Sequence, residues 1–134
     1  MSRARTLCGV VVLVAALSAS RFVKLAVVAG DSMVPSIRRG DVCVVARFGD
    51  VCEGDVILYR EPGARRAVLH RVSAVHTDGS LTTRGDGNVV PDRERVARSE
   101  VVGRVVRVVP LGGILRLESG ERDAKLQNQS DTGH

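Results

Sequence analysis

The 134-residue chain has very few aromatic side chains: it contains no tryptophan, and its aromatic residues are Phe22, Phe48 and Tyr59. Proteins that bind single-stranded nucleic acid without sequence preference stack the bases on aromatic rings. The net charge of +5 would suit either nucleic acid or an anionic membrane surface. Because a stacking platform is missing, we expect no nucleic-acid partner and favour membrane lipid as the anionic surface.

Cysteine is also scarce. Cys8, Cys43 and Cys52 are too few for a disulfide scaffold, and no Cys-x-x-Cys pair or His/Cys cluster indicates zinc. Cys43 and Cys52 flank one predicted turn, so they form either a disulfide or two buried free thiols. A chain of this length that lacks a glycine-rich strand-to-helix turn has no room for a dinucleotide domain. We therefore expect neither a metal nor a cofactor.

The balance of residues that are present is that of one folded domain, with 44% hydrophobic and 26% charged residues. Residues 1–29 differ from the rest, because the run from Leu7 to Ala19 is uncharged and is followed by Arg21 and Lys24. A cleaved signal peptide, a membrane-spanning helix from Leu7 to about Ala29, and a buried helix of a soluble domain each fit this pattern. We expect the membrane anchor, with Arg21 and Lys24 reaching the lipid head groups.

From Gly30 onward, short runs rich in valine, isoleucine, leucine and threonine alternate with turns rich in glycine and aspartate. Such spacing predicts an all-β domain, a small antiparallel barrel or sheet, over residues 30–117. Asp78-Gly79 is a tight-hairpin signal between two of the runs. The segment RGDGNVVP from Arg84 to Pro91 predicts an ordered loop, and the polar tail 118–134 is expected to be disordered. The predicted strands are Val42–Arg47, Asp55–Arg60, Ala67–Val75, Ser80–Arg84 and Val101–Val109.

Ser32 is a candidate nucleophile. It lies in GDSMVPSIRRGD, where Gly30 permits a tight turn and Pro35 stiffens the chain that follows. A serine in such a turn can project its hydroxyl while backbone N–H groups converge on one point, as an acyl-transfer nucleophile and its oxyanion hole require. From the local residues alone, a capping role for Ser32 remains open.

The serine would need a general base, and the scarcity of lysine predicts that this base is a histidine. Lys24 lies in the N-terminal segment and Lys125 in the polar tail, so the β-rich body offers only histidine. His70 lies within the apolar run AVLHRV, where a desolvated imidazole stays neutral near pH 7. His76 adjoins a predicted turn and is expected at the surface. The alternative for His70 is an ordinary strand histidine.

A histidine base usually has a carboxylate that fixes its tautomer. The segment RGDGNVVPDR supplies two candidates, Asp86 and Asp92. Both are equally well explained as turn residues that bond their own backbone. The local sequence leaves the choice open.

The order of these blocks resembles that of the signal peptidase I family. GDSMVPSIRRGD, GDVILYR, LHRV, TRGDGNVVPDR and VVGRVVRVVPLGGI follow one another over about Gly30 to Leu115. The resemblance is closest to the Ser-His branch of the family, which includes the catalytic subunit of the endoplasmic-reticulum enzyme and archaeal relatives. It implies that Ser32 is the nucleophile, that His70 is the general base and that Asp92 completes the triad, with Asp86 also functionally important.

The resemblance further implies a single-pass protein of the cell membrane with its catalytic domain outside the cytoplasm. Its substrates would be exported pre-proteins whose signal peptides have small residues before the cut. Met33 and Pro35 are then expected to contribute to shallow apolar substrate pockets.

Three alternatives remain beside this interpretation. A specialised processing protease for a few partner precursors would have the same residues. A membrane-tethered β domain that binds peptides without cutting them is a second alternative, although such a domain would not need Ser32, His70 and both aspartates. A self-cleaving repressor with a related β fold would require a lysine base, which the β-rich body lacks.

Overall fold

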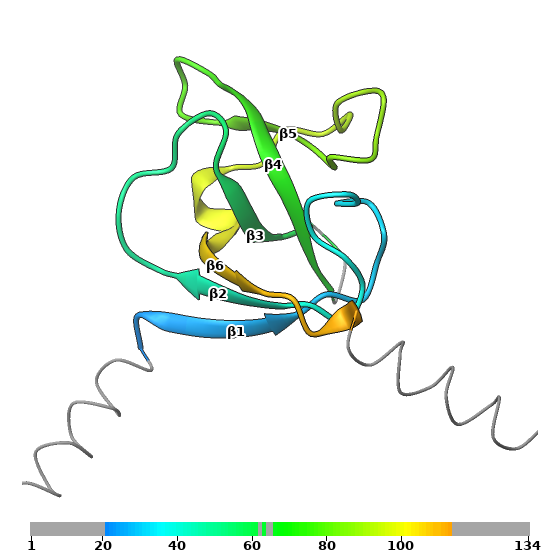
Figure 1. The fold of residues 1–134 in the computed structure, drawn as a ribbon. Helices are drawn as coiled ribbons and strands as arrows, with labels where there is room; N and C mark the ends of the chain where they lie inside the picture. The colour runs from blue at the N-terminus through cyan, green and yellow to red at the C-terminus, as the bar shows by residue number, and fades with distance from the viewer. Residues whose placement is uncertain (1–20, 62, 64–65, 114–134) are drawn as a thin grey trace, which may run out of the picture.

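The computed structural model describes residues 21–61, 63 and 66–113 (Figure 1). The uncharged run Leu7–Ala19 and the tail 118–134, expected to be an anchor and a disordered segment, lie outside the described residues. The described part is built on one six-stranded sheet with the order β1-β2-β6-β3-β4-β5. Every pair of neighbouring strands is antiparallel. The prediction of an all-β domain is confirmed.

Of the strands of the sheet, all but the first match the runs that were predicted from residue composition. They are β1 (Val23–Val27), β2 (Val42–Ala46), β3 (Val56–Arg60), β4 (Ala67–Val75), β5 (Leu81–Arg84) and β6 (Val101–Val109), with a 3₁₀ helix η1 (Arg98–Glu100) before β6. Asp78-Gly79 forms the turn between β4 and β5, where the His76 N–H donates to the Ser80 carbonyl at 2.9 Å. The segment after β5 is a loop, as predicted.

The helix expected to run to about Ala29 is wrong for its last part, because residues Val23–Val27 form β1. Val23 lies opposite Ala46 and Val27 opposite Val42, so the strand joins the sheet that was expected to begin at Gly30. At its C-terminal end, Ala26 packs against the core, while its neighbours Leu25 and Val27 are 71% and 72% exposed. Among the residues that the structure describes, no helix is long and apolar enough to span a bilayer.

Two hydrophobic clusters form the core, and β3 contributes to both. Ile57 and Tyr59 pack in one cluster, whereas Val56 and Leu58 pack against the other. This division follows from strand geometry, since successive side chains point to opposite faces. The first cluster contains Val51, Ile57, Tyr59, Val72, Leu81 and Val96, and the second contains Met33, Ile37, Cys43 and Val45.

Neither thiol of the described cysteines is in a disulfide. Cys43 is buried in β2, and burial raises the pKa of its thiol. Cys52 is exposed. The disulfide alternative is therefore not observed, and the alternative of two buried thiols is wrong for Cys52, which lies in the turn before β3.

The connection between β1 and β2 is closed at its base. The Val28 N–H donates to the Asp41 carbonyl at 2.9 Å, and the Gly40 N–H donates to the Val28 carbonyl at 2.8 Å. The buried Asp41 carboxylate also accepts hydrogen bonds from the N–H groups of Arg38 and Gly112. These bonds hold the intervening turn against the sheet, on the same side as the loop that follows β5 (Figure 1).

We predict that Gly103→Ala destabilises the sheet. Gly103 pairs with Leu58 in β3, and an added Cβ would overlap the Ala46 carbonyl oxygen and lie 2.8 Å from Val45 Cγ1. Overpacking of this kind lowers the free energy of unfolding by about 1–3 kcal/mol. Gly113→Ala is the matched control, because its Cβ would meet nothing within 4 Å. Equal denaturant midpoints for the two variants would contradict the prediction.

Candidate active site

Ser32 lies in the turn that follows β1. The Val34 N–H donates to the Asp31 carbonyl at 3.1 Å, and the Ile37 N–H donates to the Met33 carbonyl at 3.0 Å, which keeps the turn compact. The side chains of Met33 and Ile37 are buried in the core. Because its immediate neighbour is anchored in this way, half-buried Ser32 has a fixed backbone from which its hydroxyl projects.

His70 lies in β4, opposite Ile57 of β3, and is 8% exposed. Its Nε2 atom is 3.0 Å from Ser32 Oγ, and its Nδ1 atom is 2.6 Å from Asp92 Oδ2. An ionised carboxylate only accepts hydrogen bonds, so Nδ1–H donates to Asp92 and the other nitrogen of the neutral ring accepts from the serine. The structure thus joins alcohol, imidazole and carboxylate in one hydrogen-bonded chain.

The two candidate carboxylates have different partners. Asp86 forms a two-pronged ion pair with Arg71, with Nε–Oδ1 and Nη2–Oδ2 distances of 2.8 and 2.7 Å. The hydrogen bonds from Arg71 hold the pKa of Asp86 below its usual range. Arg71 also donates to the Gly54 carbonyl at 2.8 Å. The carboxylate beside His70 is therefore that of Asp92, while Asp86 ties its loop to β4.

The loop that carries both aspartates packs directly on the serine turn. The Gly87 N–H donates to the Ser32 carbonyl at 2.9 Å. A Cβ at Gly85 would lie 2.5 Å from the Ser32 carbonyl oxygen and 3.1 Å from His70 Nε2. The close approach of the loop to the serine turn therefore requires glycine at position 85, a role that was not predicted from the sequence. The signal available was the pair of glycines on either side of Asp86.

Two more side chains lie beside Asp92, and neither was predicted from the sequence. The Thr83 hydroxyl lies 2.7 Å and the Tyr59 hydroxyl 3.5 Å from Asp92 Oδ2. Burial raises the pKa of Tyr59, so its phenol keeps its proton. Thr83 follows Leu81 by two positions, as Tyr59 follows Ile57, so each is a polar-tipped residue on the inward face of a predicted strand. That alternation was the available signal.

Of the remaining residues singled out in the sequence, Met33 lies at a pocket beside Ser32, whereas Pro35 and His76 do not. Met33 lines a pocket of about 450 Å³ that also reaches Ser32, whereas Pro35 is not among the residues that line it. His76 is half-buried, with its Nε2 atom 2.7 Å from Thr82 Oγ1. Within residues 21–61, 63 and 66–113, no group of three or more histidine, cysteine or acidic side chains is arranged to hold a metal ion.

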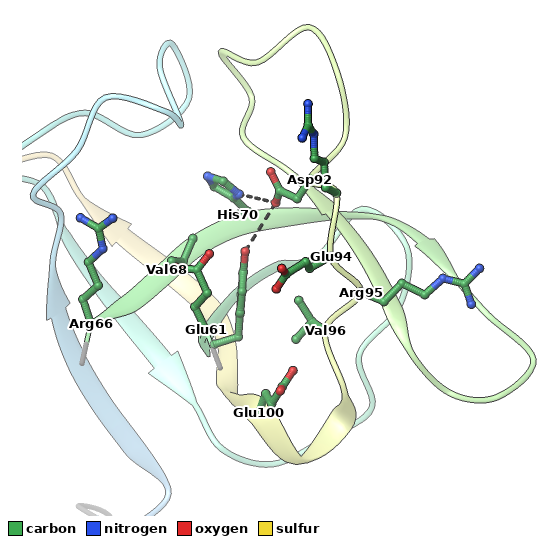
Figure 2. Close-up of a pocket in the computed structure, with 11 residues that line it drawn as sticks. Glu61, Arg66, Val68, His70, Asp92, Glu94, Arg95, Val96 and Glu100 are labelled. Atoms are coloured by element: carbon green, nitrogen blue, oxygen red, sulfur yellow. Dashed lines mark hydrogen bonds and ion pairs between the residues drawn. The ribbon is translucent and has the colours of Figure 1, made fainter. Parts of the chain in front are cut away.

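The pocket beside Ser32 is lined mainly by small and apolar residues, contributed by β1, by the serine turn, by the middle of β3 and by the start of β4. Among them are Ala26, Val28, Ala29, Met33, Leu58 and Leu69. A second pocket, of about 370 Å³, is lined in part by His70 and Asp92. In Figure 2 the Asp92 carboxylate lies beside the His70 ring at one end of this pocket. Ser32 therefore lines one pocket, and His70 and Asp92 line the other.

The arrangement can transfer a proton from the serine hydroxyl to His70 Nε2 as the oxygen attacks an electrophilic carbon. The adjoining carboxylate would stabilise the imidazolium that results. Because His70 is largely buried and Ser32 is half-buried at a pocket, the reacting oxygen is reachable while the charge pair is shielded from water. This is the chemistry of a serine hydrolase.

Comparison with known proteins gives two findings. Residues 8–106 match the family described as Peptidase S24-like. The signal peptidase complex catalytic subunit SEC11 of Chaetomium globosum is 29% identical over 110 residues, 72% of this chain and 64% of that protein. The SEC11 of Leptosphaeria maculans is 31% identical over 106 residues, 69% of this chain and 61% of that protein.

The human relative, signal peptidase complex catalytic subunit SEC11C, is 28% identical over 106 residues, 55% of its length. The chain thus spans between half and two thirds of the length of these curated relatives. The similarity to signal peptidases that the five sequence blocks indicated is confirmed. The chain therefore belongs to the S24-like peptidase family, with signal peptidase complex catalytic subunits among its relatives.

Proposed function

We propose that this protein is a serine endopeptidase that removes signal peptides from exported pre-proteins at the membrane surface. The observation that carries the proposal is the chain from Ser32 Oγ to His70 Nε2, at 3.0 Å, and from Nδ1 to Asp92 Oδ2, at 2.6 Å. The names of the relatives supply the substrate class. No cofactor is needed, since the three side chains provide nucleophile, base and counter-charge.

In the proposed mechanism, Ser32 Oγ attacks the scissile carbonyl carbon while His70 Nε2 takes its proton. The backbone N–H of Ser32 helps to hold the oxyanion that forms. The imidazolium then gives the proton to the leaving amine, and the acyl-enzyme is released by water that His70 activates in the same way. Asp92 keeps the Nδ1 proton in place throughout, and Asp86 holds the loop through Arg71.

The substrate lies along β4 in this proposal. β5 pairs only with the Arg71–Val75 part of β4, so among the described strands Ala67–His70 have a neighbour on one edge only, β3. An extended peptide can pair with such an edge. Its alternate side chains would enter the pocket beside Ser32, where Ala26, Met33 and Leu69 leave room for small apolar groups.

The membrane location rests on the sequence. The uncharged run from Leu7 to Ala19 precedes β1 by only a few residues, and an anchor there would hold the sheet close to the bilayer. We propose a single-pass protein of the cell membrane with the catalytic domain outside the cytoplasm. Membrane lipid and the pre-protein are then its partners.

The proposal is tested by cleavage of a pre-protein reporter in detergent or liposomes. Ser32→Ala and His70→Ala are each expected to lower kcat/KM by at least about a thousand-fold, because either change removes the nucleophile–base unit. His76→Ala is the matched control, since His76 contacts Thr82 and not the serine. Circular dichroism checks that all three variants fold. Undiminished cleavage in a folded Ser32→Ala or His70→Ala variant would refute the proposal.

The two aspartates are expected to separate in the same assay. Asp92→Asn replaces the carboxylate by a neutral amide, which no longer fixes the tautomer of His70 or stabilises its imidazolium, so kcat should fall by about a thousand-fold or more with little change in folding. Asp86→Asn leaves the His70–Asp92 pair intact and should retain a larger share of the activity. Equal losses of kcat would contradict the distinct roles assigned to them.

The Arg71–Asp86 pair also makes stability depend on pH. The pKa of Asp86 is lowered in the folded state, so its stabilising contribution is present above the ordinary carboxyl pKa of about 4 and is lost as the pH falls through the folded-state value. The deficit of Asp86→Asn in unfolding free energy should therefore be largest near pH 7 and shrink below about pH 4.

Denaturant unfolding at several pH values measures this deficit, and Asp31→Asn is the control. Asp31 lies 3.8 Å from Arg39, and both side chains are 65% exposed, so that pair should contribute little at any pH. A deficit for Asp86→Asn that stays constant from pH 7 to pH 3 would contradict the prediction.

A further inference from the structure

Thr83 makes a buried contact that the proposed mechanism does not use. The residue lies in β5 and is 0% exposed. Its hydroxyl is 2.7 Å from Asp92 Oδ2, the same oxygen that lies 2.6 Å from His70 Nδ1. One carboxylate oxygen therefore faces both the catalytic ring and a hydroxyl group enclosed by the protein.

The direction of this hydrogen bond follows from its partners. A hydroxyl has one proton to donate, and an ionised carboxylate has none. The Thr83 hydroxyl is 3.4 Å from the Tyr59 hydroxyl, a much longer contact than the 2.7 Å to Asp92. Thr83 therefore donates to Asp92, and Tyr59, with its own proton retained, is left as the weaker second donor at 3.5 Å.

The backbone fixes the same pair of residues. The Asp92 N–H donates to the Thr83 carbonyl at 2.8 Å, so the two residues are joined through both main chain and side chain. Asp92 belongs to a loop, where a carboxylate would otherwise be free to rotate about its side-chain bonds. Together the two bonds leave its Oδ2 atom aimed at His70.

We propose that Thr83 is a positioning residue of the active site that acts through Asp92. Its hydroxyl holds Oδ2 toward Nδ1 of His70 and withdraws electron density from that oxygen. The inference rests on the proposed function. It adds that Thr83 in β5 sets the basicity of the His70–Asp92 pair, and with it the pH range of activity.

The expected direction of the pH effect follows from the donor. A carboxylate that loses a hydrogen-bond donor holds protons more tightly, and so does an imidazole beside it. Removal of the Thr83 hydroxyl should therefore move the acidic limb of the pH–kcat profile to higher pH. The other ionisable groups at the pocket beside this pair stay the same in every variant. They come from β3, the connection between β3 and β4, the loop and η1: Tyr59, Glu61, Arg66, Arg93, Glu94, Arg95 and Glu100.

The test compares Thr83→Val, which keeps the branched shape, with Thr83→Ser, which keeps the hydroxyl. Thr83→Val should lower kcat about ten-fold and raise the apparent pKa of the acidic limb by about half a unit or more, with KM nearly unchanged. Thr83→Ser should restore both. Thr82→Val is the matched control, because the neighbouring hydroxyl contacts His76 instead. If Thr83→Val fails to fold, Thr83→Ala removes the same hydroxyl without a buried methyl in its place.

A second measurement does not depend on cleavage. The imidazole NMR signals of the intact chain in detergent, with His70 assigned by its loss in His70→Asn, give the apparent pKa of the pair directly. A higher value in Thr83→Val and a wild-type value in Thr83→Ser support the inference. Wild-type titration in Thr83→Val, or the same shift in Thr83→Ser, overturns it. Failure of the proposed function itself would show separately, as absence of Ser32-dependent cleavage in the wild-type chain.

Discussion

The hydrogen bond between the Ser32 hydroxyl and His70 Nε2 is the interaction on which the site depends. The serine lies in the turn before β2 and the histidine lies in the interior of β4. The two residues are far apart in the sequence, so only the packing of the fold brings them together. Three packed elements do so: the serine turn with Met33 and Ile37 in the core, the β3–β4 pair, and the loop that rests on both. Their convergence turns an ordinary alcohol into a potential nucleophile.

The loop after β5 is the element that completes this convergence. Glycine at position 85 lets the loop approach the serine turn, Asp86 ties it to β4 through Arg71, and Asp92 at its far end reaches the His70 ring. This one loop thus supplies both the carboxylate that pairs with Arg71 and the carboxylate that contacts His70. The two aspartates of the RGDGNVVPDR block therefore contact different partners, Asp86 the Arg71 side chain and Asp92 the His70 ring.

Much of this could be predicted from the sequence, because the information was local. The runs of β-branched residues predicted β2 to β6 closely. The expectation that no lysine belongs to the β-rich body was wrong for Lys24, which lies in β1; its side chain is exposed there, and the ring beside Ser32 is that of His70. β1 was missed, since its five residues continue the composition of the apolar segment before them and only pairing with β2 makes them a strand. The choice of Asp92 over Asp86, and the contacts of Thr83 and Gly85, depend on how distant segments pack, which local patterns do not reveal.

The most direct measurement of the central claim is covalent labelling by a serine-directed acylating probe, with the modified residue located by peptide mass spectrometry. The account predicts a single adduct on Ser32 in the wild-type chain, which disappears in His70→Ala because the hydroxyl then has no base. A folded chain that binds peptide and is never acylated, or one labelled at another serine, would contradict it and would favour a peptide-binding domain without catalysis.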